Sequence, residues 1–356
     1  MYVMRHTTVG LINRNTDKAT PGFTIVSPMF ATGVYLIDLD GAVVHQWDTD
    51  LVPGKYAYLL DNGNLLWSGQ TDLGPKPAGG KGGIIRELSW EGEVLWEYID
   101  HSQHHDFRRL RNGNTLYIGW EEIPKAKASI VRGGVVDTED EKGVIWGDFL
   151  KEVDPTGKVV WEWHIHSDLK IENYPLHIMS QRNEFAHCNS CSELPDGNIL
   201  LSFRRISTLL IIDKATKQVK WCHRDDNWGQ QHDAEMLKNG NILFFANGIH
   251  VPQGVLYSRV IEINPGTQEE AWFYEDTPNW NFFSPNISGC QRLDSGNTLI
   301  CEGLTGRIFE VTRDREVVWE YINPWYGGEQ SRVDSNAVFR SYRYSADSPQ
   351  IRSRLV

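Results

Sequence analysis

The chain has 356 residues, of which 40% are hydrophobic and 23% are charged, and its formal net charge is −12. This composition gives ample apolar material for a core and excludes a disordered chain. Nucleic acids and anionic membranes bind basic surfaces, so the acidic balance predicts neither as a partner. Closed all-β architectures of this length commonly form one domain.

The sequence carries no recognisable targeting segment. Residues 1–10 include His and Thr where a secretory signal has an apolar stretch. No run approaches the roughly 18 apolar residues needed to span a bilayer. Five cysteines, an odd number, give no disulfide framework. We therefore expect a cytoplasmic protein, and the sequence leaves room for a homo-oligomer.

Six copies of a hairpin pattern run along the chain, and each copy ends in Trp. Apolar residues alternate on both sides of a polar turn, which is typical of paired antiparallel strands. The spacing from one of these Trp residues to the next is 47 to 65 residues. The copies cover residues 33–47, 83–96, 149–161, 209–221, 260–272 and 308–319.

A second turn follows each of the first five copies. Its glycine is preceded by Asn, Asp or Ser and followed by Asn, a combination that favours a tight hairpin. Two hairpins per copy make a four-stranded sheet, and the spacing matches propeller blades with variable loops. The turn glycines are Gly63, Gly113, Gly197, Gly240 and Gly296.

These patterns predict an all-β fold, a six-bladed β-propeller with four-stranded antiparallel blades, as a single domain over residues 1–345. An array of β-sandwiches is the less favoured alternative. The sixth copy lacks a second turn, so its outermost strand is expected from the N-terminal segment near Phe23–Val26, which would close the ring and remove exposed sheet edges. Residues 121–147 and 164–186 are expected as loops on one rim, and the polar residues 346–356 as a surface tail. The blades are expected near residues 33–70, 83–120, 148–205, 208–248, 258–303 and 306–344.

The position eight residues before the turn glycine is polar in copies two to five, where it reads His105, Asn189, His232 and Ser288. In a propeller this strand begins near the central channel, so these side chains should converge there, together with His187 and Arg204. Tyr56 and Asp334 are assigned to comparable positions in copies one and six. Other histidines fall on outer strands or loops and are interpreted as incidental: His45, His101, His164, His166, His177 and His223.

An ordered set of segments then resembles the bacterial arylsulfate sulfotransferases, whose catalytic domain is a six-bladed propeller. The resemblance spans residues 30 to 325. It rests on His104-His105-Asp-Phe, Leu110-Arg-Asn-Gly-Asn, His187-Cys-Asn189-Ser, Ile199-Leu-Leu-Ser-Phe-Arg204, Gln218-Val-Lys-Trp221, Gln231-His232-Asp-Ala, Phe245-Ala-Asn-Gly248, Tyr257-Ser-Arg259-Val-Ile-Glu262 and Phe283-Ser-Pro285. The N-terminal β-sandwich and export signal of well-known members are absent from this sequence.

The resemblance implies a transferase that moves a sulfuryl group from an aryl sulfate ester to a phenolic acceptor through a sulfohistidine, without an external cofactor. His232 matches the family's nucleophile, and a neutral imidazole suits covalent catalysis. Arg204, His187 and Asn189 would stabilise developing negative charge, and His105 would transfer protons to and from the phenols. The partners would then be a small anionic aryl substrate and a phenol.

Further residues are candidates for binding the substrate. Asn189 occupies a channel position and His104 adjoins one. Arg205 competes with Arg204, because only one of two neighbours on a strand can face the channel. Flat apolar walls for an aryl group are expected from Trp120, Trp280 and Phe282, with Trp325 as a further candidate.

Several motifs favour structural roles. Asp106 and Asp233 follow channel histidines, and we expect them to serve packing or a turn. Cys188 and Cys191 have the spacing of a redox pair or half a zinc site, but they lack a matching second pair and are read as core residues. The acidic residues 137–142 are expected to form a solvated loop.

Two other functions remain open on the sequence. His105, His187 and His232 could instead hold a divalent metal such as Zn or Mn and support a lyase or hydrolase acting on an anionic aryl or sugar substrate. Alternatively, the propeller could be a binding module without catalysis. Metal analysis and the His232→Ala variant would separate these readings.

Overall fold

The computed structural model describes residues 8–251, 254–327 and 334–355. Strands dominate this part of the chain, and its two α-helices, α1 (Lys125–Ala128) and α2 (Ile165–Asp168), are single turns. No helix among the described residues is long and apolar enough to cross a membrane. Residues 1–7, part of the segment inspected for a signal, lie outside the described residues. Short 3-10 turns are η1 (Ile171–Asn173), η2 (Arg204–Ile206), η3 (Asp226–Trp228), η4 (Asn279–Asn281) and η5 (Gly303–Thr305).

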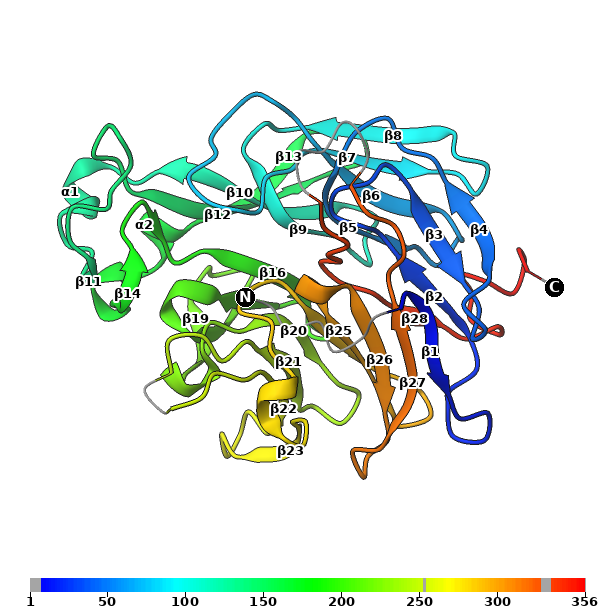
Figure 1. Cartoon of the computed structure of the whole chain (residues 1–356). Coiled ribbons are helices and arrows are strands. Elements are labelled where there is room, and N and C mark those ends of the chain that lie inside the picture. Colours follow the sequence, from blue (N-terminus) through cyan, green and yellow to red (C-terminus); the bar gives the residue numbers. More distant parts are fainter. Residues whose placement is uncertain (1–7, 252–253, 328–333, 356) are drawn as a thin grey trace.

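Six antiparallel sheets form the blades of a propeller, which confirms the predicted fold (Figure 1). We number the blades in chain order, starting with the first blade whose four strands are consecutive along the chain. The strands of each blade are given from the innermost to the outermost. Blade 1 contains β5 (Pro53–Leu59), β6 (Leu65–Gln70), β7 (Gly83–Leu88) and β8 (Val94–Ile99). Blade 2 contains β9 (Gln103–Arg109), β10 (Thr115–Glu122), β12 (Trp146–Val153) and β13 (Val159–His164). Blade 3 contains β16 (Cys188–Glu193), β17 (Ile199–Phe203), β18 (Thr208–Ile212) and β19 (Val219–Arg224).

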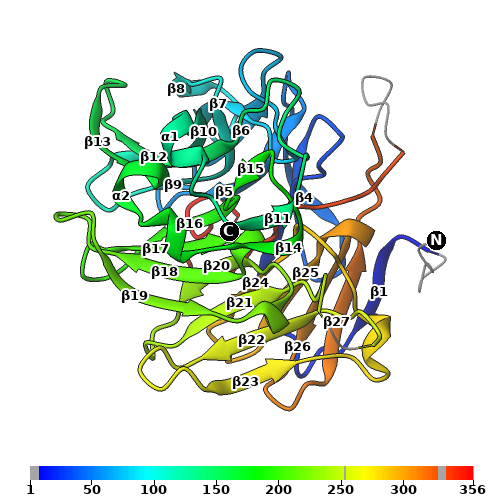
Figure 2. The ribbon, with the colours of Figure 1, turned by 90° about the vertical axis from the view of Figure 1, so that its left-hand side faces the viewer.

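The remaining blades follow the same order, and Figure 2 shows blades 3 to 5 stacked side by side. Blade 4 contains β20 (His232–Met236), β21 (Ile242–Ala246), β22 (Arg259–Ile263) and β23 (Glu270–Tyr274). Blade 5 contains β24 (Gly289–Arg292), β25 (Thr298–Glu302), β26 (Arg307–Val311) and β27 (Val317–Ile322). Blade 6 contains β28 (Arg343–Tyr344), β2 (Phe23–Val26), β3 (Val34–Ile37) and β4 (Val43–Trp47).

The two ends of the chain meet in blade 6 and close the ring. Strand β2 pairs with the C-terminal strand β28, with Phe23 opposite Tyr344. The expected outermost position of Phe23–Val26 is therefore wrong, because β28 supplies the innermost strand and β2 lies next to it. The outer addition is instead β1 (Gly10–Arg14), which pairs with β27 as a fifth strand of blade 5 (Figure 1).

The predicted blade limits are also offset by half a blade. Each of the ranges 33–70, 83–120, 148–205, 208–248, 258–303 and 306–344 joins the outer hairpin of one sheet to the inner hairpin of the next. The reason is that the chain enters the ring in the middle of blade 6, so the repeating pattern in the sequence starts out of phase with the sheets.

The six Trp residues that mark the copies link neighbouring blades. Each indole N–H donates to a backbone carbonyl in the outer turn of the following blade, so each Trp satisfies its polar atom at a blade interface. The last bond, from Trp319 to Leu39, joins blade 5 to blade 6 and so completes the circle. The pairs are Trp47 with Ser89, Trp96 with Pro155, Trp161 with Lys214, Trp221 with Pro265, Trp272 with Arg313 and Trp319 with Leu39, at 2.8 to 3.0 Å.

The two insertions pack against each other beside blade 2. Strand β11 (Gly133–Val135) of the first pairs in parallel with β14 (Leu176–Gln181) of the second, and β15 (Glu184–Phe185) pairs with β12. The C-terminal residues after Tyr344 are not a loose surface tail, because Ile351 is fully buried in the core that contains Trp47.

Candidate functional site

The innermost strands bring His105, His187 and His232 together at the channel. The rings of His105 and His187 lie 4.5 Å apart, and Phe339 from the C-terminal segment lies 6.0 Å from His105 and 6.4 Å from His232. All three histidines are buried. The structure therefore brings these three side chains together at the channel, as the repeat predicts.

Two of these histidines have a strained backbone. His105 and His187 adopt positive φ angles of 49° and 63°, and Ala186 has 69°. Non-glycine residues rarely hold this conformation, which costs of order 1–3 kcal/mol and concentrates at functional sites. Gly80 (φ 120°) lies against the His105 ring, and a Cβ on it would stand 1.9 Å from His105 Cε1. The loop between β6 and β7 can therefore cover His105 only because residue 80 is a glycine.

The tautomer of His232 is fixed by Asn247. The Nδ2 of Asn247 donates to the carbonyls of Ser284 and Ile287, so its Oδ1 faces His232 Nδ1 at 2.7 Å. His232 therefore carries its proton on Nδ1, which leaves the lone pair of the neutral imidazole on Nε2. Burial, followed by the nearby charge of Arg204, lowers the pKa of His232 to about 3, so the imidazole is neutral at pH 7.

His187 is held by a carboxylate that the sequence reasoning did not single out. Its Nδ1 bonds to Glu184 Oε2, and the indole N–H of Trp120 donates to Glu184 Oε1. Burial and the charge of Arg204 keep the pKa of His187 well below its usual value. Glu184 comes from β15, inside the second insertion, where the repeating pattern of the blades gives no signal.

His105 stands at the end of a second buried chain. Its Nδ1 lies 2.8 Å from Nδ1 of His104, whose Nε2 lies 3.2 Å from Oδ1 of Asp148. Burial and then the neighbouring Glu184 raise the pKa of Asp148 well above its usual value. Burial lowers the pKa of His104 to about 3. His104, predicted to bind substrate, therefore lies behind His105 and orients it.

Two cations next to the histidines make no direct ion pair with a described residue, although the carboxylate of Glu184 partly offsets the lowering of the Arg204 pKa by burial. The guanidinium of Arg204 and the ammonium of Lys55, which is 8% exposed, make no hydrogen bond and no ion pair with any described residue. Burial and the charge of Arg205 lower the pKa of Arg204 to about 10, and burial lowers that of Lys55 to about 8. Both positive charges also depress the pKa values of nearby histidines, Arg204 at His187 and Lys55 at His105.

Lys55 was missed because the first copy was counted from the wrong residue. Eight residues before Gly63 is Lys55 and not Tyr56. Tyr56 instead donates its hydroxyl to the carboxylate of Asp106, and Asp334 is exposed. The eight-residue rule therefore gives Lys55, His105, Asn189, His232 and Ser288 for blades 1 to 5, and Ser288 has a structural role in accepting a bond from the Gly303 N–H.

Arg205 is committed to the framework. Its Nη1 donates to Gln181 O, Asn183 Oδ1 and Glu184 O at 2.7 to 3.0 Å, and its Nη2 lies 3.5 Å from Glu184 Oε2. Both arginines lie in the η2 turn and not on a strand, so the expected alternation of faces does not apply. Arg204 is the free cation, while Arg205 anchors the segment that carries Glu184.

Below the histidines, a buried ion network occupies the axis. Arg340, fully buried, lies 3.1 Å from both Asp106 Oδ2 and Asp233 Oδ1, and its Nη2 donates to Asn189 O at 2.6 Å. Arg108 lies 3.3 Å from Asp106 and 3.8 Å from Asp233. The two aspartates also accept backbone N–H bonds from the next inner strand, at Cys191 and Cys290. The network links blades 2 to 6 around the channel, which gives both aspartates a framework role.

Asn189 is fully buried beside this network. Its Nδ2 donates to Gln231 O at 2.7 Å, and its Oδ1 has no hydrogen-bond partner among the described residues. An unpaired buried acceptor costs about 1–3 kcal/mol. A ligand hydroxyl that donates to Oδ1 would remove this cost.

The four aromatic residues predicted to line an aryl-binding wall lie in different surroundings. Trp280, 60% exposed, lines a cleft of about 450 Å³ together with Tyr257, and the cleft also contacts Ala246 and Gly248, on either side of Asn247. Phe282 is fully buried among Phe245, Tyr274 and Phe309, so it cannot line this cleft. Trp120 is also buried, stacked on His104 at 4.2 Å, and Trp325 stacks on Tyr35 at 3.7 Å.

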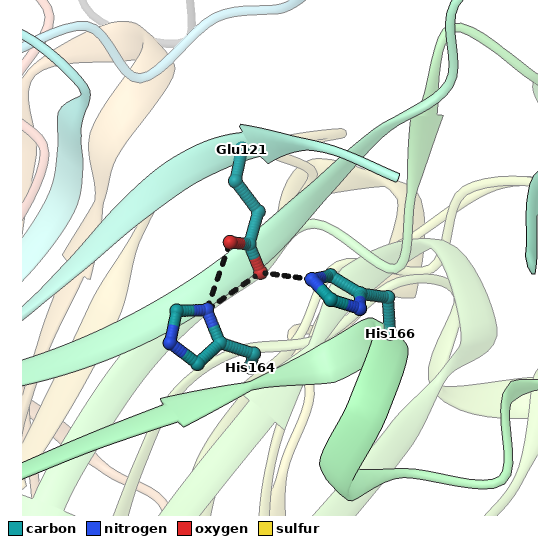
Figure 3. A group of neighbouring side chains, drawn as sticks. All are labelled: Glu121, His164 and His166. Carbon is teal, nitrogen blue, oxygen red and sulfur yellow. Dashed lines mark hydrogen bonds and ion pairs between the residues drawn. The ribbon is translucent and has the colours of Figure 1, made fainter. Parts of the chain in front are cut away.

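A cluster of potential metal ligands lies away from the channel. Among the described residues, one group of three potential ligands has its ligating atoms within 4.8 Å of one another, and it consists of Glu121, His164 and His166 (Figure 3). His105, His187 and His232 do not form such a group. The cysteines Cys188 and Cys191 are buried and unbridged within the core next to blade 3.

Comparison with known proteins identifies the family. A model of the arylsulfotransferase (ASST) family matches residues 57–324. The chain belongs to this family. The match covers every inner strand from β9 to β24 and confirms the resemblance found in the ordered sequence segments. No curated protein shows significant sequence similarity to this arylsulfotransferase-family chain.

Solved structures similar to this family member share its architecture at low sequence identity. A protein of unknown function from Bacteroides caccae has a TM-score of 0.56 and 14% identity, covering 91% of this chain and 99% of its own. The virginiamycin B lyase of Staphylococcus aureus has a TM-score of 0.48 and 10% identity, covering 90% of both chains. An identity of 14% to the Bacteroides caccae protein indicates a common fold and not a common activity.

Proposed function

We propose that this protein transfers a sulfuryl group from an aryl sulfate ester to a phenol through a covalent adduct on His232. The observation that carries the proposal is the pair of cations without a direct ion pair, Arg204 and Lys55, beside a buried neutral imidazole whose lone pair is on Nε2. Isolated buried charges are costly, so the site is built to receive an anion. A sulfate monoester carries one negative charge and brings an electrophilic sulfur next to the nucleophile.

The first half-reaction attaches the sulfuryl group to the protein. The Nε2 lone pair of His232 forms a bond to sulfur while the bond between sulfur and the phenolic oxygen breaks, and the phenolate leaves with the electron pair. The imidazole becomes cationic, and Asn247 Oδ1 stabilises that charge through its bond to Nδ1. Arg204 and Lys55 compensate the sulfuryl oxygens and the developing phenolate.

The second half-reaction returns the sulfuryl group to an acceptor. The acceptor phenol loses its proton to a neutral imidazole as its oxygen bonds to sulfur, and the bond between nitrogen and sulfur breaks to restore His232. His105 is the proposed proton carrier, since it is a buried imidazole whose Nδ1 lies 2.8 Å from Nδ1 of His104. His187 is oriented by Glu184 and stabilises the transferring group. The aryl ring would lie in the cleft that includes Trp280.

An assay with a panel of aryl sulfates tests this function. We expect release of the phenol from a nitrophenyl sulfate, faster when a second phenol is added, because the acceptor empties the adduct. His232→Ala should abolish release, while the matched control His223→Ala, an imidazole beside Trp228 on the outer strand β19, should retain it. Failure of the whole panel to release phenol would overturn the proposal.

A further inference from the structure

Away from the channel, blade 2 carries a cluster of two imidazoles and a carboxylate. Glu121 lies at the end of β10, His164 ends the outermost strand β13, and His166 lies in the single turn of α2. Their side chains point toward one another from three different elements (Figure 3). None of the three takes part in the proposed sulfuryl transfer.

The distances place three donor atoms around one point. Nδ1 of His164 lies 2.8 Å and 3.0 Å from the two oxygens of Glu121, and Nε2 of His166 lies 3.4 Å from Glu121 Oε1. All three ligating atoms fall within 4.8 Å of one another. Side-chain exposures of 21% to 24% leave the cluster within reach of solvent while keeping each side chain largely packed.

The far side of His164 has the partner that metal-bound histidines usually have. Its Nε2 lies 3.5 Å from Oε2 of Glu162, while its Nδ1 faces Glu121. An imidazole that binds a metal through one nitrogen commonly donates the other N–H to a carboxylate, which fixes the tautomer and raises its basicity. Asp168 Oδ2 also accepts from the His164 N–H at 2.7 Å, which holds the backbone of α2 in place.

The charged groups around Glu121 also favour the binding of a cation. Within the described part of the chain, its carboxylate has only the two imidazoles as polar side-chain partners, and it has no Lys or Arg. Two histidine nitrogens and a carboxylate oxygen form a donor set that suits Zn²⁺, with water as the fourth ligand.

We propose that Glu121, His164 and His166 bind a divalent transition-metal ion of the zinc class. The ion would join β10 and β13 to α2, which lies in the same insertion as Glu184. It would therefore stabilise the segment that supplies the carboxylate partner of His187, which makes it a structural site distinct from the channel.

Zinc titration of the chelator-treated full-length protein tests the site. Isothermal calorimetry with ZnCl₂ should give one equivalent of tight binding. Loss of an outer-shell partner typically lowers metal affinity about 10- to 100-fold, so Glu162→Gln should fall in that range and Glu121→Gln or His166→Ala at or beyond its upper end. The control His177→Ala, an imidazole that stacks on His250, should bind zinc like the wild type.

A second readout reports the structural role. Hydrogen exchange in residues 164–186 should slow on addition of zinc in the wild type and stay unchanged in Glu121→Gln. The near-isosteric Glu121→Gln change keeps the fold, and circular dichroism of each variant checks this. The proposal is overturned if the wild type binds no stoichiometric zinc, if Glu121→Gln binds it as tightly as the wild type, or if His232→Ala abolishes the binding.

Discussion

The bond between Asn247 and His232 makes the sharpest prediction about the channel. Asn247→Ala removes the acceptor that lies 2.7 Å from His232 Nδ1. Hydrogen bonds to charged groups contribute about 1.5–3 kcal/mol, and the imidazole becomes cationic only as the adduct forms. At 1.36 kcal/mol per tenfold, kcat should fall about 10- to 150-fold. The measurement is single-turnover release of nitrophenol from nitrophenyl sulfate.

Asn247→Asp keeps an acceptor oxygen next to His232 Nδ1 and adds a negative charge, so it tests the effect of charge alone. A carboxylate beside Nδ1 favours the protonated imidazole, so it should raise the pKa of His232 from about 3. The nucleophile is then lost as the pH falls through the raised value, and the acidic limb of the rate profile moves to higher pH. The reasoning fails if Asn247→Ala, shown to be folded, stays within threefold of the wild-type rate, or if Asn247→Asp keeps the wild-type profile.

Three more predictions follow from neighbouring residues. Arg340→Met leaves Asp106 and Asp233 without their main cation and should cost about 3–5 kcal/mol of unfolding free energy by urea denaturation, a loss that Asp233→Asn in the same chain should partly restore. Lys55→Met should raise KM for the aryl sulfate; in the wild type we expect KM to rise above about pH 8, where Lys55 loses its charge, and this rise should be absent from the variant. Gly80→Ala places a methyl group 1.9 Å from His105 Cε1, so kcat/KM should fall at least about tenfold, and the strain at this position should also lower the melting temperature.

The number of blades could be predicted from the sequence because it depends on local patterns. Alternating strands, polar turns and a terminal Trp are repeated six times, and each Trp has the same task of bonding to the next blade. The phase of the blades could not be predicted in this way. It depends on which strands pair across the closure, and the pairing of β2 with β28 joins residues more than 300 positions apart.

The repeating pattern also predicts the histidines of the site, since His105 and His232 occupy equivalent positions on inner strands. Their partners were harder to find. Glu184 lies in an insertion outside the repeating pattern, and Asn247 was present in a matching segment without any sign of its bond to His232. The stacking candidate Phe282 failed because exposure near a rim depends on packing by Tyr274 and Phe309, which sequence spacing does not reveal.

The central claim is that His232 Nε2 carries the sulfuryl group. The most direct measurement is mass spectrometry of the protein, rapidly quenched under alkaline conditions after mixing with an aryl sulfate and no acceptor. We predict an added sulfuryl group that maps to the peptide containing His232, disappears on addition of a phenol, and is absent from His232→Ala. Phenol release without any such adduct, or an adduct that persists in His232→Ala, would contradict the account.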